Sequence, residues 1–90
     1  MTSSEPDRLR IVVGEPGLAR ALRDAGHEVI YTGPDQSPEQ IVATAIQEDA
    51  DVIGLSARSD GEPALAADLA ALLARHGVDD IAVKLLSSRP

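Results

Sequence analysis

The chain has 90 residues, with 15 acidic against 8 basic side chains and a formal net charge of -7. This length allows one small domain, and we expect a disordered leader over residues 1–8 and a single domain over 9–90. The negative charge argues against nucleic-acid partners, whose phosphates attract Lys and Arg. The sequence has no cysteine, which excludes disulfides and thiolate metal sites. Because no segment reads as a membrane span or a signal peptide, we expect a cytoplasmic protein with no membrane partner.

The first third of the chain alternates between strand and helix signals. Residues 9–13 form a short β-branched run that ends at Gly14, which predicts a buried strand. Apolar residues at helical spacing predict a helix over 18–25, with Gly26 in the left-handed position just after it. Residues 28–31 predict a second strand.

The clearest local signal in the chain is the start of the second helix. Ser37 can cap that helix, Pro38 suits its first turn, and Gln40 can complete a capping box. Apolar residues then follow at helical spacing. The predicted buried stripe of this helix consists of Ile41, Val42, Ala45 and Ile46.

The rest of the chain repeats the same alternation. Residues 51–56 predict a third strand, residues 63–76 a third helix ended by Gly77, and residues 81–86 a fourth strand. Strands that alternate with helices predict an α/β fold, a flavodoxin-like or Rossmann-like open parallel sheet with helices on both faces. Lys84 inside the fourth strand favours an edge position, because an edge lysine discourages pairing with other sheets.

Ligands of open parallel sheets bind beyond the carboxyl ends of the strands. In this sequence that edge contains small and hydroxylated residues, and these are the candidate cofactor-binding residues. They are Gly14, Thr32, Gly33, Ser56 and Ser59.

No catalytic residue and no metal ligand is predicted. The spacing of Gly14 and Gly17 does not match a dinucleotide-binding loop, and Ser56 ends the third strand where a phosphoacceptor domain needs an aspartate. His27 and His76 both precede strands, so we expect them at the opposite, amino edge of the sheet. The acidic residues before the third and fourth strands read as solvated loops.

Three segments carry a resemblance to a known family. They are ALRDAGHEVIYTG at 21–33, QSPEQIV at 36–42 and EDADVIGLS at 48–56. Together they resemble the cobalamin (B12)-binding domain of methylmalonyl-CoA mutase and related acyl-CoA mutases. The likeness extends over about residues 9–85. It implies a Rossmann-like sheet of strand order 2-1-3-4, with the corrin ring over the carboxyl edge.

The sequence departs from this family at the carboxyl edge. The resemblance implies an Asp-x-His-x-x-Gly loop after the first strand, whose histidine coordinates cobalt, and this sequence lacks it. The family's Ser-x-Leu stands here as Ser56 followed by Ala57 and Arg58, and its Gly-Gly pair stands as Leu86 and Ser87. The family's last strand and helix are also absent from the 90 residues, so we expect a truncated, degenerate domain from which cobalamin binding has been lost.

Two functions follow from this reading. In the first, the chain is a non-catalytic subunit or interaction module, at most an accessory domain of a cobalamin-dependent mutase. Apolar surface left uncovered would then contact a second copy, a mutase-type partner or a biosynthetic protein. In the second, the carboxyl edge still holds cobalamin, another corrinoid or a different small ligand, with hydroxyls from Thr32, Ser56 and Ser59.

Overall fold

The computed structural model describes residues 8–56 and 62–86. The predicted disordered leader, apart from Arg8, lies outside them, as does Ser59. The elements are β1 (Arg10–Val13), α1 (Pro16–Asp24), β2 (Glu28–Tyr31), α2 (Pro38–Gln47), β3 (Val52–Ser56), α3 (Glu62–Arg75) and β4 (Ala82–Leu86). The predicted alternation of strands and helices is confirmed, with bounds that differ by one or two residues. Among the described residues, no helix is long and apolar enough to cross a membrane.

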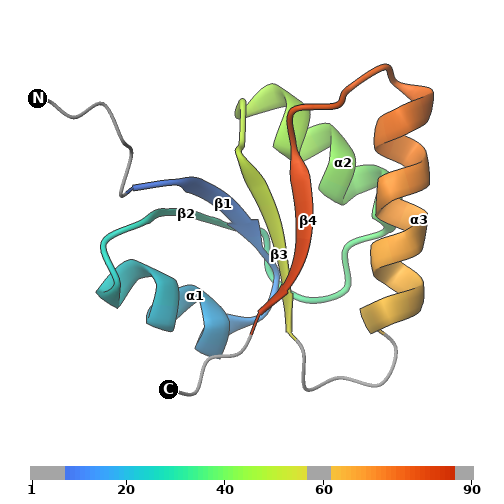
Figure 1. Ribbon diagram of the computed structural model, residues 1–90. Coiled ribbons are helices and arrows are strands. Elements are labelled where there is room, and N and C mark those ends of the chain that lie inside the picture. The colour runs from blue at the N-terminus through green and yellow to red at the C-terminus, as the bar shows by residue number, and fades with distance from the viewer. Residues whose placement is uncertain (1–7, 57–61, 87–90) are drawn as a thin grey trace, which may run out of the picture.

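The four strands form one parallel sheet in the order β2-β1-β3-β4. Helix α1 lies on one face of this sheet, and α2 and α3 lie on the other (Figure 1). Both the predicted fold class and the strand order implied by the resemblance are therefore confirmed. β4 is an edge strand and the side chain of Lys84 is exposed, as its position in the sequence predicted.

The apolar core is divided into two clusters by the sheet. The larger cluster lies under α2 and α3, and its buried members are Val12, Ile41, Val42, Ala45, Ala50, Ile53, Leu55, Leu69 and Leu73. The smaller cluster lies under α1, and its buried members are Ile11, Val13, Leu18, Ala19 and Val52. Strand residues alternate between the two clusters because successive side chains of a strand point to opposite faces.

One residue of the predicted core lies outside it. The side chain of Ile46 is 40% exposed, whereas Ile41, Val42 and Ala45 of the same helix are buried. At about 100° per residue, position 46 lies at the margin of the stripe that the other three define. Ile46 therefore lies next to the buried residues of α2, but the buried face of this helix is narrower than the sequence predicted.

The helix ends follow the sequence signals closely. The Ser37 hydroxyl accepts from the Gln40 backbone N–H at 3.1 Å, and the Gln40 side chain accepts from the Ser37 N–H at 2.8 Å. Gly26 and Gly77 adopt left-handed φ values of 99° and 73° after α1 and α3. The His27 N–H then donates to the Leu22 carbonyl at 3.1 Å. These caps orient each helix for its return to the amino edge of the sheet.

Candidate functional site

The structure brings three of the predicted site residues into contact at the carboxyl edge. The loops after β1 and β2 meet there because their parent strands are neighbours. A Cβ atom on Gly14 would lie 2.9 Å from the Gly33 carbonyl oxygen and 3.4 Å from the Thr32 Oγ1 atom. The Thr32 hydroxyl lies 3.2 Å from the Gly33 carbonyl and 3.4 Å from the Val13 carbonyl, to either of which it can donate. The hydrogen of the Thr32 hydroxyl group is thus donated to a backbone carbonyl.

Glu15 occupies the start of α1, a role that the sequence analysis missed. Its Oε1 atom accepts from the Leu18 backbone N–H at 2.6 Å, so Glu15 caps the helix. A carboxylate at this position also interacts favourably with the positive end of the helix dipole. The signal was present in the sequence, because Pro16 directly after Glu15 suits the first turn of a helix. The connection between β1 and α1 therefore consists of only Gly14 and Glu15.

The carboxyl end of β3 lies beside these loops. Ser56 is the last residue of β3, is half-buried and pairs with Leu86 of β4. A Cβ atom on the buried Gly54 would lie 3.1 Å from Leu86 Cδ1, so the Leu86 side chain covers the sheet at this point. The other predicted hydroxyl, that of Ser59, lies outside the described residues. Of the five predicted site residues, the structure thus places four along one edge.

Both histidines lie at the opposite edge, as predicted. His27 immediately precedes β2, and its Nδ1 atom accepts from the Leu9 backbone N–H at 3.0 Å. His76 follows α3 and is exposed. Its backbone N–H donates to the carbonyls of Leu72 and Leu73 in the last turn of that helix. The His27 side chain therefore has a local structural role at the amino edge.

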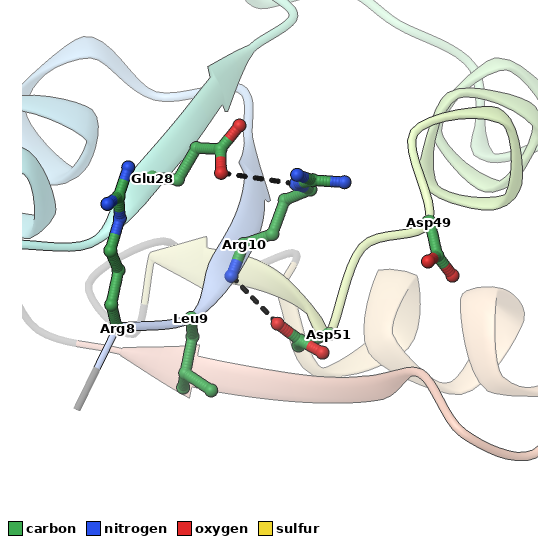
Figure 2. A pocket seen from close by; sticks show the side chains of 6 residues that line it. All are labelled: Arg8, Leu9, Arg10, Glu28, Asp49 and Asp51. Carbon is green, nitrogen blue, oxygen red and sulfur yellow. Dashed lines mark hydrogen bonds and ion pairs between the residues drawn. The ribbon is translucent and has the colours of Figure 1, made fainter. Parts of the chain in front are cut away.

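A polar pocket of about 280 Å³ lies at this amino edge (Figure 2). Its lining residues are Arg8, Leu9, Arg10, Glu28, Asp49 and Asp51. The Arg10 Nε atom lies 3.3 Å from Glu28 Oε1 and forms an ion pair with it. The Arg10 Nη1 atom donates a hydrogen bond of 2.8 Å to the Glu48 backbone carbonyl, just after α2. The Arg10 N–H also donates to Asp51 Oδ2 at 2.9 Å.

Arg10 therefore connects β1 to the starts of β2 and β3 and to the end of α2. Within residues 8–56 and 62–86, no three His, Asp or Glu side chains are grouped to hold a metal ion.

The comparison with protein-family models agrees with this architecture. Residues 12–84 match the model described as the B12 binding domain. The chain belongs to the B12-binding domain family. The resemblance seen in the sequence is confirmed at the level of the family, and the carboxyl edge described above is the edge on which that resemblance places the corrin ring.

The curated relatives of this B12-binding domain are acyl-CoA mutases and their small subunits. The 2-hydroxyisobutanoyl-CoA mutase small subunit of Aquincola tertiaricarbonis is 47% identical over 66 residues, which are 73% of this chain and 48% of that one. The pivalyl-CoA mutase small subunit of Xanthobacter autotrophicus is 47% identical in an alignment 58 positions long, which covers 53% of this chain and 39% of that one.

The ethylmalonyl-CoA mutase of Methylorubrum extorquens is 39% identical in an alignment 84 positions long, which covers 82% of this chain and 12% of that one. The chain thus spans about half the length of the first relative and much less of the ethylmalonyl-CoA mutase.

Proposed function

We propose that this chain is a non-catalytic accessory domain of an acyl-CoA mutase, which acts through protein contact and supplies no ligand to cobalt. The observation that carries the proposal is the two-residue connection between β1 and α1. It has no room for a loop that could present an imidazole, and its only ionisable side chain, that of Glu15, caps α1. Kinship with two mutase small subunits supports a role beside a larger catalytic chain.

The positions of the histidines support the same proposal. A bond from imidazole to a metal such as cobalt requires a separation of about 2 Å, by analogy with zinc. β1 separates the His27 edge from the carboxyl edge, and four residues at ~3.3 Å each span on the order of 10 Å. The residues of this chain therefore do not fit a cobalamin held through a protein histidine.

A titration with cobalamin tests this proposal. The protein is mixed with hydroxocobalamin and separately with adenosylcobalamin, and the visible absorbance reports whether cobalt keeps its own base. We expect no base-off spectrum at micromolar concentrations. Two matched variants, His27→Gln and His76→Gln, serve as controls. A base-off spectrum in the parent protein that either variant abolishes would refute the proposal.

A mixing experiment tests the contact with a mutase. The purified protein is combined with the large subunit of the 2-hydroxyisobutanoyl-CoA mutase of Aquincola tertiaricarbonis and separated by size-exclusion chromatography with light scattering. We expect a joint peak, because the small subunit of that enzyme is 47% identical to this chain over the shared region. Two separate peaks would contradict the mutase contact. The mass of the protein alone decides whether it pairs with a second copy, which is one of the three partners that the sequence analysis left open.

A second function is favoured by the contact between Gly14, Thr32 and Gly33. This group presents backbone and hydroxyl oxygens at the edge where ligands of parallel sheets bind. A corrinoid held there would keep its own base on cobalt, because this edge offers no imidazole to replace it. The cobalamin spectrum would then stay base-on, as in the free cofactor, so saturable binding has to be followed by fluorescence, and Thr32→Val would weaken that binding. Tyr31, the one aromatic residue of the chain, lies beside Thr32 and offers a fluorescence signal.

A further inference from the structure

His27 joins the starts of two neighbouring strands. Its Nδ1 atom accepts from the Leu9 backbone N–H at 3.0 Å, and Leu9 directly precedes β1. The backbone N–H of Glu28, the first residue of β2, donates to the Leu9 carbonyl at 2.9 Å. Both polar backbone groups of Leu9 are therefore bonded to residues at the start of β2, and one of these two bonds depends on an ionisable side chain.

The bond from Leu9 requires a neutral imidazole. A ring nitrogen that accepts a hydrogen bond carries no hydrogen, so the hydrogen of the neutral His27 ring is on Nε2. The cationic ring carries a hydrogen on both nitrogens, so its Nδ1 atom donates and cannot accept. Protonation of His27 therefore replaces the bond with two donors that face each other.

The main chain holds His27 beside Leu9 in either charge state. The His27 backbone N–H donates to the Leu22 carbonyl of α1 at 3.1 Å, and Gly26 before it adopts a left-handed φ of 99°. The side chain of His27 is half-buried. After protonation the ring can separate from Leu9 only by rotating about its own side-chain bonds.

Several charged residues lie in the elements that meet at this contact. They are Arg8 and Arg10 on either side of Leu9, Arg23 and Asp24 in the last turn of α1, Glu28 after His27, and Asp49 and Asp51 before β3. In the part of the chain that the structure describes, none of their carboxylates forms an ion pair with His27, and that of Glu28 pairs with Arg10 instead. The protonated ring thus gains no ion pair in this fold to replace the bond that it loses.

We infer that His27 is a pH-sensitive switch between the starts of β1 and β2, bonded to Leu9 when neutral and released from it when protonated. Histidine side chains change charge near about pH 6.5, so the bond stabilises the fold above that pH. The unfolded chain binds the proton more readily than the fold that contains the bond, so this contribution is lost as the pH falls. The inference concerns stability and is independent of the proposed accessory function.

Urea denaturation at about pH 7.5 and about pH 5 tests the switch, with the fold followed by circular dichroism. In His27→Asn the amide oxygen stands where Nδ1 stood and can accept from Leu9 at both pH values. On acidification, the unfolding equilibrium constant of the parent protein should rise about three- to fivefold more than that of His27→Asn. The matched variant His76→Asn should keep the pH response of the parent protein, because it removes the other imidazole and leaves this contact intact.

A measurement on the parent protein tests the same bond without a substitution. The ¹⁵N NMR signals of the His27 ring at neutral pH should show a hydrogen on Nε2 and none on Nδ1. The Leu9 amide, corrected for intrinsic exchange at each pH, should lose protection as the pH falls. A parent protein with the same pH response as His27→Asn, or a neutral ring with its hydrogen on Nδ1, would overturn the inference. Either result leaves the accessory function to the cobalamin and mutase experiments.

Discussion

The contact between the loops after β1 and β2 can be tested with two glycine-to-alanine substitutions. At Gly14 the new methyl group would lie 2.9 Å from the Gly33 carbonyl oxygen, which belongs to the backbone and cannot turn away. At Gly17, in the first turn of α1, the nearest atom is Glu15 Oε2 at 3.2 Å, at the end of an exposed side chain. Neither glycine has a positive φ, so the pair isolates the steric effect from backbone strain.

We expect the two substitutions to change stability in opposite directions. A methyl group forced into this contact destabilises the folded protein by about 1–3 kcal/mol. Alanine also lowers the conformational entropy of the unfolded chain, which offsets about 0.4–1 kcal/mol of that loss. Gly14→Ala should therefore lower the free energy of unfolding by about 1–2 kcal/mol. Gly17→Ala should raise it by about 0.5 kcal/mol, because alanine is the better helix former.

Urea denaturation followed by circular dichroism measures both changes. With an m-value of about 1–2 kcal/mol/M for a small domain, the midpoint of Gly14→Ala should fall by about 1 M. An unchanged or higher midpoint for Gly14→Ala would refute the close approach of the two loops. A Gly17→Ala variant less stable than Gly14→Ala would refute the assignment of the contact to Gly14.

Two further substitutions test the packing and the capping on the other face of the sheet. Leu69→Ala should destabilise the protein by about 2–5 kcal/mol, because the Leu69 side chain of α3 is fully buried in the larger core cluster. Thermal melts should show a large fall in Tm, and a small fall would mean that α3 packs loosely. Ser37→Ala should cost about 1 kcal/mol, because it removes the capping bond to the Gln40 N–H. Urea midpoints measure this loss, and Ser37→Asp, which can still cap α2, should restore most of it.

Features set by nearby residues could be predicted from the sequence. The cap of α2 depends on Ser37, Pro38 and Gln40, which lie within four positions of one another, and the structure reproduces it in both hydrogen bonds. The left-handed turns at Gly26 and Gly77 are equally local. The edge position of β4 could be predicted from Lys84 because a charged side chain in a strand is tolerated best where one side of the strand is open.

Features set by tertiary packing could not be predicted in the same way. The contact of Gly14 with Gly33 depends on the register of β1 with β2, which brings together residues that lie nineteen positions apart in the chain. Arg10 reads in the sequence as an ordinary strand residue. Only the fold shows that its side chain reaches the Glu48 carbonyl and the Glu28 carboxylate.

The unequal division of the core has a consequence for local unfolding. The cluster under α1 contains fewer buried residues than the cluster under α2 and α3, and no residue of β2 is fully buried. Segments with few buried apolar contacts open most readily from the native state. The α1–β2 unit therefore forms the weaker cooperative unit, and its amide hydrogens should exchange ahead of those in β3. Because the loops that carry Gly14 and Thr32 flank that unit, we expect these loops to open with it, while the end of β3 at Ser56 stays folded.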